Sequence, residues 1–130
     1  MSGVRVLTVD DHASFRSAVR SVVAATDGFT LGGEVATGED GVAAWSRLRP
    51  DITLMDVRLP GISGYEATRR ITHLAPDALV VLVSAAEEAI QGDEAARCGA
   101  VAFVRKLDVS PGLLERIWRV HGAGRPAPTA

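Results

Sequence analysis

The sequence predicts an α/β fold of the (βα)5 type, in which a five-stranded parallel sheet in strand order 2-1-3-4-5 carries helices on both faces. Short apolar runs rich in β-branched residues recur along the chain, and amphipathic helical patterns separate them. Such runs are typical of the buried strands of a parallel sheet. Right-handed crossovers join strands of this kind, and the order 2-1-3-4-5 is a common arrangement for five of them.

Five apolar segments are expected to form the strands. The second segment has the weakest pattern, and the other four are short and strongly apolar. The strands are predicted at Val4–Val9, Phe29–Leu31 continuing in Gly33–Ala36, Ile52–Met55, Leu79–Val83 and Val101–Val104.

Helical periodicity accounts for the segments between the first three strands. Residues Ser14–Ala25 carry apolar side chains at i, i+4, i+7 and i+8, which predicts an amphipathic helix that Gly28 terminates. Residues 42–48 repeat the pattern over a shorter length. We expect a second helix there, which Pro50 ends because the residue before a proline disfavours helical geometry.

A helix-start signal opens the third helix. Ser63 followed by Glu66 has the spacing of a capping box, in which each side chain hydrogen-bonds the backbone of the other residue. The buried face of this helix is expected to carry Ala67, Ile71 and Leu74. Segment Glu87–Gly99 is a poor helix by pattern. Its few apolar residues fit either a segment that moves or a merely short and irregular helix.

The last helix has signals at both ends. Ser110 and Pro111 form an N-cap and first-turn pair, and Gly122 closes the helix. Residues 1–121 are therefore expected to form one domain. Residues 122–130, rich in glycine, proline and alanine, are either a flexible tail or the start of an interdomain linker.

Composition limits the class of protein. Of the 130 residues, 47% are hydrophobic and 23% charged, which is usual for a single globular domain. Lys and Arg number 14 against 16 Asp and Glu, so direct nucleic-acid contact by this domain is not expected. No apolar run could span a bilayer and no signal pattern precedes the first strand, so we expect a cytoplasmic protein without membrane contact. The single cysteine, Cys98, excludes an internal disulfide.

Charged and hydroxyl side chains follow four of the predicted strands. Asp10 and Asp11 come directly after the first strand, Asp56 after the third and Ser84 after the fourth, and Lys106 stands two residues beyond the fifth. In an open parallel sheet, ligands bind beyond the carboxyl ends of the strands, where the strand order reverses. These side chains are therefore expected to meet at one edge and form the functional site.

Three carboxylates at one edge would repel one another, and a hard divalent cation, Mg²⁺ or Mn²⁺, is the expected remedy. Two carboxylates and water molecules would satisfy such an ion, which leaves one oxygen of Asp56 free as a nucleophile. The ammonium group of Lys106 and the hydroxyl of Ser84 would complement the oxygens of a phosphoryl group in transfer. His12, beside the acidic pair, is a candidate metal ligand, but capping or packing of the loop is the favoured interpretation.

Four motifs surround these residues, namely Val9–His12, Leu54–Gly64, Val81–Ala85 and Gly99–Lys106. Together they resemble the receiver domains of two-component response regulators, of which the chemotaxis protein CheY is the single-domain type. The resemblance extends from Val4 to about His121 and implies a flavodoxin-like, CheY-like fold. Asp-Asp-His after the first strand and the sequence of the third helix look most like the NarL/FixJ-type branch. Members of that branch usually carry a helix-turn-helix DNA-binding domain after the receiver.

The resemblance implies a role for each acidic residue. Asp56 would be the phosphoacceptor, which takes its phosphoryl group from a sensor histidine kinase. Asp11, Asp56 and the backbone carbonyl of Arg58 would ligate Mg²⁺ directly, and Asp10 would act through water.

The same resemblance implies how the phosphorylated state is read. Lys106 would pair with the phosphoryl group, and the Ser84 hydroxyl would close on it. Phe103 occupies the aromatic switch position and would turn inward when Ser84 moves. Leu107 stands where many relatives have a proline after the lysine, so a cis-proline is excluded there.

We therefore expect a phosphorylatable signalling domain, rather than an enzyme, that takes part in its own Mg²⁺-dependent phosphorylation and dephosphorylation. It is expected to control transcription through a DNA-binding domain beyond this chain, and to form a homodimer. The alternative is a stand-alone receiver, or a receiver-like interaction module that is never phosphorylated. A haloacid-dehalogenase-type phosphatase would need an aspartate where Arg58 stands. A flavodoxin-type flavin protein would need a Ser/Thr/Gly-rich loop after the first strand.

Overall fold

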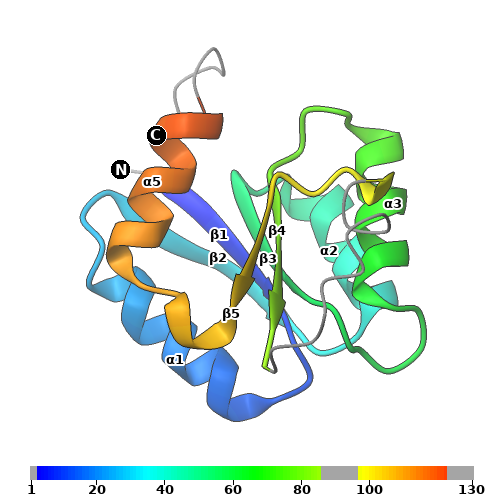
Figure 1. The fold of residues 1–130 in the computed structure, drawn as a ribbon, viewed down its shortest axis with the longest axis horizontal. Helices are drawn as coiled ribbons and strands as arrows, with labels where there is room; N and C mark the ends of the chain where they lie inside the picture. Colours follow the sequence, from blue (N-terminus) through cyan, green and yellow to red (C-terminus); the bar gives the residue numbers. More distant parts are fainter. Residues whose placement is uncertain (1–2, 86–96, 123–130) are drawn as a thin grey trace.

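The computed structural model describes residues 3–85 and 97–122 (Figure 1). Most of the predicted Glu87–Gly99 helix and the tail beyond Gly122 lie outside the described residues. Strands and helices alternate along the chain as β1 (Val4–Val9), α1 (Ala13–Ala24), β2 (Phe29–Val35), α2 (Gly38–Leu48), β3 (Ile52–Asp56), α3 (Gly64–Leu74), β4 (Val80–Ser84), β5 (Ala102–Arg105), the 3₁₀ turn η1 (Lys106–Asp108) and α5 (Pro111–His121).

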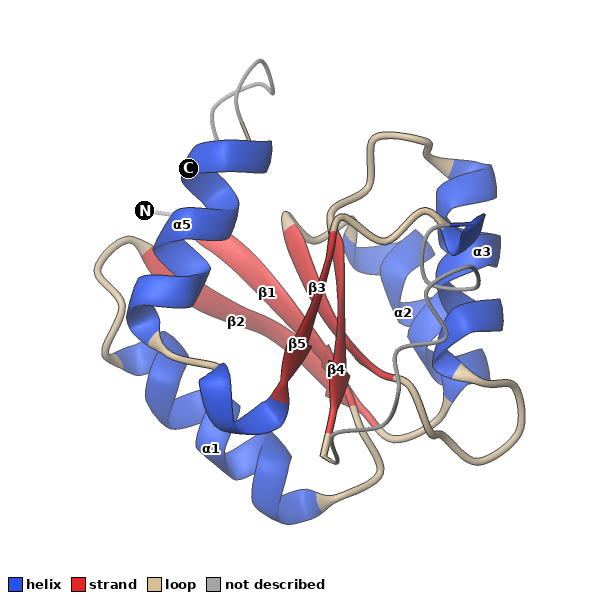
Figure 2. Cartoon of the chain, viewed as in Figure 1, coloured by secondary structure: helices blue, strands red, loops and turns tan. Residues whose placement is uncertain are grey.

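The five strands form one parallel sheet in the order β2-β1-β3-β4-β5, which confirms the predicted topology. Helices α1 and α5 cover one face of the sheet, and α2 and α3 cover the other (Figure 2). The strand order reverses between β1 and β3, and Val9 pairs with Met55 at their carboxyl ends. This pairing places the residues that follow β1 beside the end of β3.

Two apolar layers hold the helices against the sheet. Val4 and Val6 of β1 contribute to the layer under α1 and α5, whereas Leu7 and Val9 contribute to the layer under α2 and α3. Since side chains alternate between the two faces of a strand, a fully buried strand supplies both layers. Trp45 of α2 is buried in the second layer. The central strands are therefore fixed from both sides.

The first helix has nearly the predicted bounds, but Gly28 does not end it. Helix α1 stops at Ala24, four residues before Gly28, so the prediction that Gly28 terminates it is wrong. Gly28 instead forms the turn into β2 with a φ of 83°, a left-handed conformation that glycine adopts without a Cβ penalty. Its carbonyl oxygen accepts a hydrogen bond from the backbone N–H of Val4. Gly28 therefore ties the start of β2 to the start of β1.

Helix α3 departs from the prediction at both ends. The Ser63 hydroxyl accepts a hydrogen bond from the Glu66 backbone N–H at 3.1 Å, as predicted. The Glu66 carboxylate, however, binds Arg69 and Arg70, so the prediction of a reciprocal capping box is wrong in this half. The prediction that Leu74 lies on the buried face is also wrong, because its side chain is 54% exposed. Leu74 is the last residue of the helix, and Ala78, beyond the turn, fills that layer of the core.

Helix α5 has the predicted ends. The Ser110 hydroxyl accepts a hydrogen bond from the Leu113 N–H, and Gly122 is the C-cap. Ile117 is buried and Trp118 packs partly buried against the same layer, whereas Val120 is exposed. None of the helices within residues 3–85 and 97–122 has the length and apolar character needed to cross a bilayer.

Candidate functional site

The predicted site residues lie at the carboxyl edge of the sheet. Asp10 directly follows β1, Asp56 is the last residue of β3, and Ser84 is the last residue of β4. Asp56 pairs with Val83 in the register of the sheet, so Asp56 and Ser84 stand at neighbouring strand ends. Lys106 begins the η1 turn directly after β5. The four strand ends therefore bring these side chains to one edge, as the sequence predicted.

Lys106 joins two buried carboxylates. Its Nζ lies 2.6 Å from Asp10 Oδ2 and 3.3 Å from Asp56 Oδ2. The side chains of Asp10 and Asp56 are 0% and 5% exposed, and that of Lys106 is 11% exposed. Burial weakens the solvation of all three charges, and their mutual contacts compensate for part of that loss. The side chain of Asp11 is more exposed, at 36%.

The electrostatics of Asp56 are dominated by burial. Desolvation raises the pKa of the Asp56 carboxyl above its usual 3.8, and the neighbouring negative charge of Asp10 raises this pKa further. The ammonium group of Lys106 and a 3.2 Å hydrogen bond from the backbone N–H of Arg58 act in the opposite direction. Positive charge added near Asp56 would favour the ionised carboxylate and so counteract the raised pKa.

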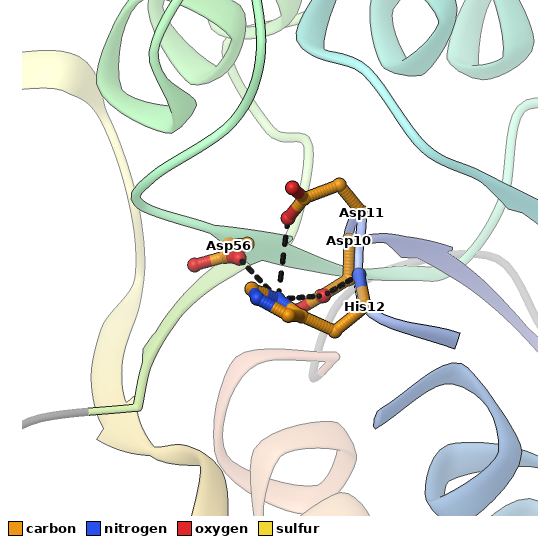
Figure 3. A group of neighbouring side chains, drawn as sticks. All are labelled: Asp10, Asp11, His12 and Asp56. Carbon is orange, nitrogen blue, oxygen red and sulfur yellow. Dashed lines mark hydrogen bonds and ion pairs between the residues drawn. The ribbon is translucent and has the colours of Figure 1, made fainter. Parts of the chain in front are cut away.

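The imidazole of His12 lies inside the acidic cluster (Figure 3). Its Nδ1 is 3.1 Å from Asp10 Oδ1, 3.2 Å from Asp11 Oδ1 and 3.9 Å from Asp56 Oδ2. His12 is the N-cap residue of α1, but its side chain makes no capping hydrogen bond. His12 therefore caps the helix as expected, but through its backbone carbonyl, which accepts hydrogen bonds from Phe15 and Arg16. Its backbone N–H donates to Asp10 Oδ1 at 2.7 Å, which fixes the turn after β1.

The loop after Asp56 is packed against the backbone of the acceptor strand. The N–H of Gly64 donates to the carbonyl of Val57 at 2.9 Å. A Cβ on Gly64 would overlap the carbonyl oxygen of Asp56 and lie 2.9 Å from Cα of Val57. Only glycine permits so close an approach, so Gly64 helps to fix the position of Asp56.

Two further residues hold the site, and the sequence analysis missed both. Arg16 of α1 donates from a guanidinium nitrogen to the carbonyl oxygen of Asp10 at 2.6 Å, and it also approaches Glu34 of β2. Glu39 in the first turn of α2 accepts a hydrogen bond from the N–H of Ile62 in the loop after Asp56. Arg16 follows His12 by one helical turn, which is the one sequence signal that could have suggested its proximity.

The predicted switch residues occupy the adjacent strands. Ser84 is buried at the end of β4, and Phe103 is half-buried in β5. Leu82 pairs with Phe103, and Ser84 pairs with Arg105. Phe103 packs against the apolar layer under α2 and α3. Ala85, directly after Ser84, is exposed.

The residues at this edge fit a hard divalent cation. Asp10, Asp11, His12 and Asp56 offer one ligand atom each, and these four atoms lie within 4.8 Å of one another. Asp10 Oδ2 is buried without a partner of hydrogen-bond geometry, although Lys106 is close enough for an ion pair. Oxygen-rich sets of this kind suit Mg²⁺ and Mn²⁺. The donor set and the buried carboxylate thus support a metal site here.

Comparison with known proteins identifies relatives of the whole domain. A family model described as the response regulator receiver domain matches residues 6–117. The chain is 37% identical over 118 residues to the response regulator GacA of Pseudomonas viridiflava, an alignment that covers 91% of this chain and 54% of GacA. It is 33% identical over 104 residues to the chemotaxis protein CheY of Thermotoga maritima, covering 80% of this chain and 86% of that protein. The chain therefore spans about half the length of GacA and most of the length of CheY.

A solved structure shows the same architecture. The chain superposes on the response regulator domain of Thermotoga maritima CheB with a TM-score of 0.81 and 31% sequence identity. The superposition covers 93% of this chain and 98% of that domain. The similarity therefore extends over nearly the whole chain.

Proposed function

This chain belongs to the response regulator receiver family, and from that premise we propose that Asp56 accepts a phosphoryl group from a sensor histidine kinase. The observation that carries the proposal is the position of Asp56. Its carboxylate is at the end of the central strand β3, with Lys106 Nζ 3.3 Å from one oxygen and the N–H of Arg58 3.2 Å from the other. These two contacts hold the carboxylate in one orientation, and an oxygen of Asp56 is thereby positioned to attack a phosphorus atom.

In the proposed reaction, an Asp56 oxygen attacks the phosphorus atom of a phosphohistidine on the kinase. The new O–P bond forms as the P–N bond to the donor imidazole breaks, and the electron pair of that bond stays on the imidazole nitrogen. Lys106 and the Ser84 hydroxyl donate to the phosphoryl oxygens, where negative charge accumulates. Orientation and charge stabilisation, rather than a covalent intermediate elsewhere on this chain, supply the catalysis.

We propose that Asp11, Asp56 and the carbonyl oxygen of Arg58 hold the Mg²⁺ or Mn²⁺ ion directly, and that Asp10 acts through water. The ion supplies positive charge that offsets the carboxylates and the incoming phosphoryl oxygens. Burial raises the pKa of Asp56 in its absence, so a cation beside Asp56 favours the ionised nucleophile. Ser84 and Phe103, which lie on the adjacent strands β4 and β5, would change conformation in response to phosphorylation.

The output proposed for the whole protein is control of transcription. Resemblance to the NarL/FixJ-type branch and the coverage of only 54% of GacA both support a DNA-binding domain beyond residues 1–121. A stand-alone cytoplasmic receiver is the second candidate, by similarity to the chemotaxis protein CheY. Self-association stays a prediction. Helix α5 contributes little apolar surface to it, because Ile117 and most other apolar residues of this helix face the sheet.

Phosphorylation by a small donor tests the proposal without the kinase. The wild-type chain, Asp56→Asn and Asp27→Asn would each be incubated with acetyl phosphate and Mg²⁺, and intact mass would be measured. Asp27 is an exposed aspartate in the turn between α1 and β2 and serves as the matched control. We expect one added phosphoryl group in wild type and in Asp27→Asn, and none in Asp56→Asn. An unmodified wild-type chain would favour the interaction module that is never phosphorylated.

A further inference from the structure

We propose that His12 is a nitrogen ligand of the divalent-cation site and gives this receiver a preference for transition-metal ions over Mg²⁺. The inference rests on the cation site proposed above and concerns which ion it selects. Its starting point is the position of the His12 ring, whose Nδ1 faces the carboxylates of Asp10, Asp11 and Asp56 (Figure 3).

The spacing of the donor atoms supports ligation. In an octahedral complex with bonds of about 2.1 Å, adjacent ligand atoms lie about 3 Å apart. His12 Nδ1 is 3.2 Å from Oδ1 of Asp11, a proposed direct ligand, and 3.1 Å from Oδ1 of Asp10, which would reach the ion through water. The separation of His12 Nδ1 and Asp11 Oδ1 therefore matches that of two neighbouring ligand atoms on one ion.

The surrounding backbone holds the ring in this position. The His12 N–H is bound to Asp10 Oδ1, and the His12 carbonyl accepts hydrogen bonds from Phe15 and Arg16 at the start of α1. Arg16 in turn donates to the carbonyl oxygen of Asp10. The turn after β1, which carries Asp10 and Asp11, is therefore constrained on both sides of His12. The ring itself is 60% exposed, so an ion can reach Nδ1 from solvent.

The chemistry of the ligand determines the selectivity. Carboxylate, carbonyl and water oxygens suit Mg²⁺, whereas imidazole suits Ni²⁺, Co²⁺ and Zn²⁺, and affinity for such mixed sites rises from Mn²⁺ to Ni²⁺. A site of aspartates alone would distinguish these ions less strongly than a site with one imidazole. His12 would take a coordination position that water fills in a purely oxygen-ligated site. It would contribute little to Mg²⁺ binding and much to Ni²⁺ binding.

The test uses the metal ions alone and does not depend on phosphorylation. Affinities for Mg²⁺ and Ni²⁺ would be measured by calorimetry on the wild-type chain, His12→Ala, Asp11→Ala and His73→Ala. His73 is an exposed histidine on α3 and serves as the control. Even outer-shell partners change metal affinity by about 10- to 100-fold, so loss of a direct ligand should lower Ni²⁺ affinity at least about tenfold. Mg²⁺ affinity should change much less, and His73→Ala should match wild type.

Pulsed electron paramagnetic resonance of bound Mn²⁺ gives a direct readout of the ligand. We expect the nitrogen coupling of a coordinated imidazole in wild type and in His73→Ala, and its loss in His12→Ala. An equal change of Mg²⁺ and Ni²⁺ affinity in His12→Ala, or a nitrogen coupling that survives the substitution, would overturn the assignment. Failure of the cation site itself would look different, because Asp11→Ala would then bind both ions as wild type does.

Discussion

The ammonium nitrogen of Lys106 lies 2.6 Å from Asp10 Oδ2, although the two residues are 96 positions apart in the sequence. Lys106 is the single lysine of the chain among 13 arginines. It follows the edge strand β5, reaches across the end of β3, and meets the residue that follows β1. One side chain thus links three strand ends and neutralises part of the buried negative charge.

Removal of this ammonium group should destabilise the metal-free domain. Lys106→Met would leave Asp10 and Asp56 buried without their cation, and we expect the free energy of unfolding to fall by about 3 kcal/mol. Addition of Mg²⁺ should restore part of this loss. Urea unfolding with and without Mg²⁺ measures both effects. Arg105→Gln is the control, because the exposed pair of Arg105 with Asp108 should contribute less than about 1 kcal/mol. Equal stability of the two variants would contradict the proposed role of Lys106.

Replacement of Asp56 should stabilise the metal-free protein at neutral pH. The pKa of Asp56 is raised in the folded state above 3.8, so the folded state binds this proton more tightly than the unfolded state does. The free energy of unfolding therefore falls as pH rises from 3.8 through the raised pKa, and the penalty persists at neutral pH. Asp56→Asn carries no such penalty and should melt at a higher temperature. Thermal melts from neutral pH to below 3.8 should show this advantage disappearing on acidification. A difference independent of pH would exclude burial of the charge as its cause.

Gly64→Ala should displace the acceptor. The added Cβ would overlap the carbonyl oxygen of Asp56, and overpacking of this kind costs about 1–3 kcal/mol. We expect slower phosphorylation by acetyl phosphate together with the loss of stability. Gly112→Ala is the matched control, because a Cβ there has its nearest neighbour at 3.9 Å. The control should phosphorylate normally and retain or gain stability. Normal phosphorylation of Gly64→Ala would show that the glycine does not position Asp56.

The Ser84 hydroxyl should be needed for the response to phosphorylation and dispensable for phosphorylation itself. Ser84→Ala is expected to accept the phosphoryl group and to lose most of the chemical-shift change at Phe103. Ser84→Thr keeps the hydroxyl and should retain that change. NMR spectra of both variants before and after addition of acetyl phosphate measure the effect. An unchanged Phe103 response in Ser84→Ala would assign the switch to another residue.

Those parts of the fold that depend on burial could be predicted from the sequence. Continuous apolar runs such as Leu79–Val83 are typical of strands covered on both faces, so strands and layers followed from the pattern. The convergence of Asp10, Asp56 and Lys106 followed in turn from the positions of the strand ends. Periodicity alone failed at Leu74, where the helix ends and a residue beyond the turn fills the core.

Interactions that depend on the direction of a side chain could not be predicted. The sequence places His12 beside the acidic pair, but the direction of its ring depends on the turn conformation after β1, which no residue pattern specifies. Glu39 binds the loop after Asp56 across 23 positions of sequence, and nothing in its local sequence indicates that contact. Such contacts arise only once strands and helices have been assembled.

The identity of the modified residue tests the central claim most directly. After incubation with acetyl phosphate and Mg²⁺, an acyl phosphate can be reduced with borohydride, which converts the phosphorylated aspartate to homoserine. Mass spectrometry of the peptides then locates that residue. We expect homoserine at position 56 in the wild-type chain, and no conversion at any residue in Asp56→Asn. Conversion at Asp10 or Asp11 in the wild-type chain, with Asp56 intact, would contradict it.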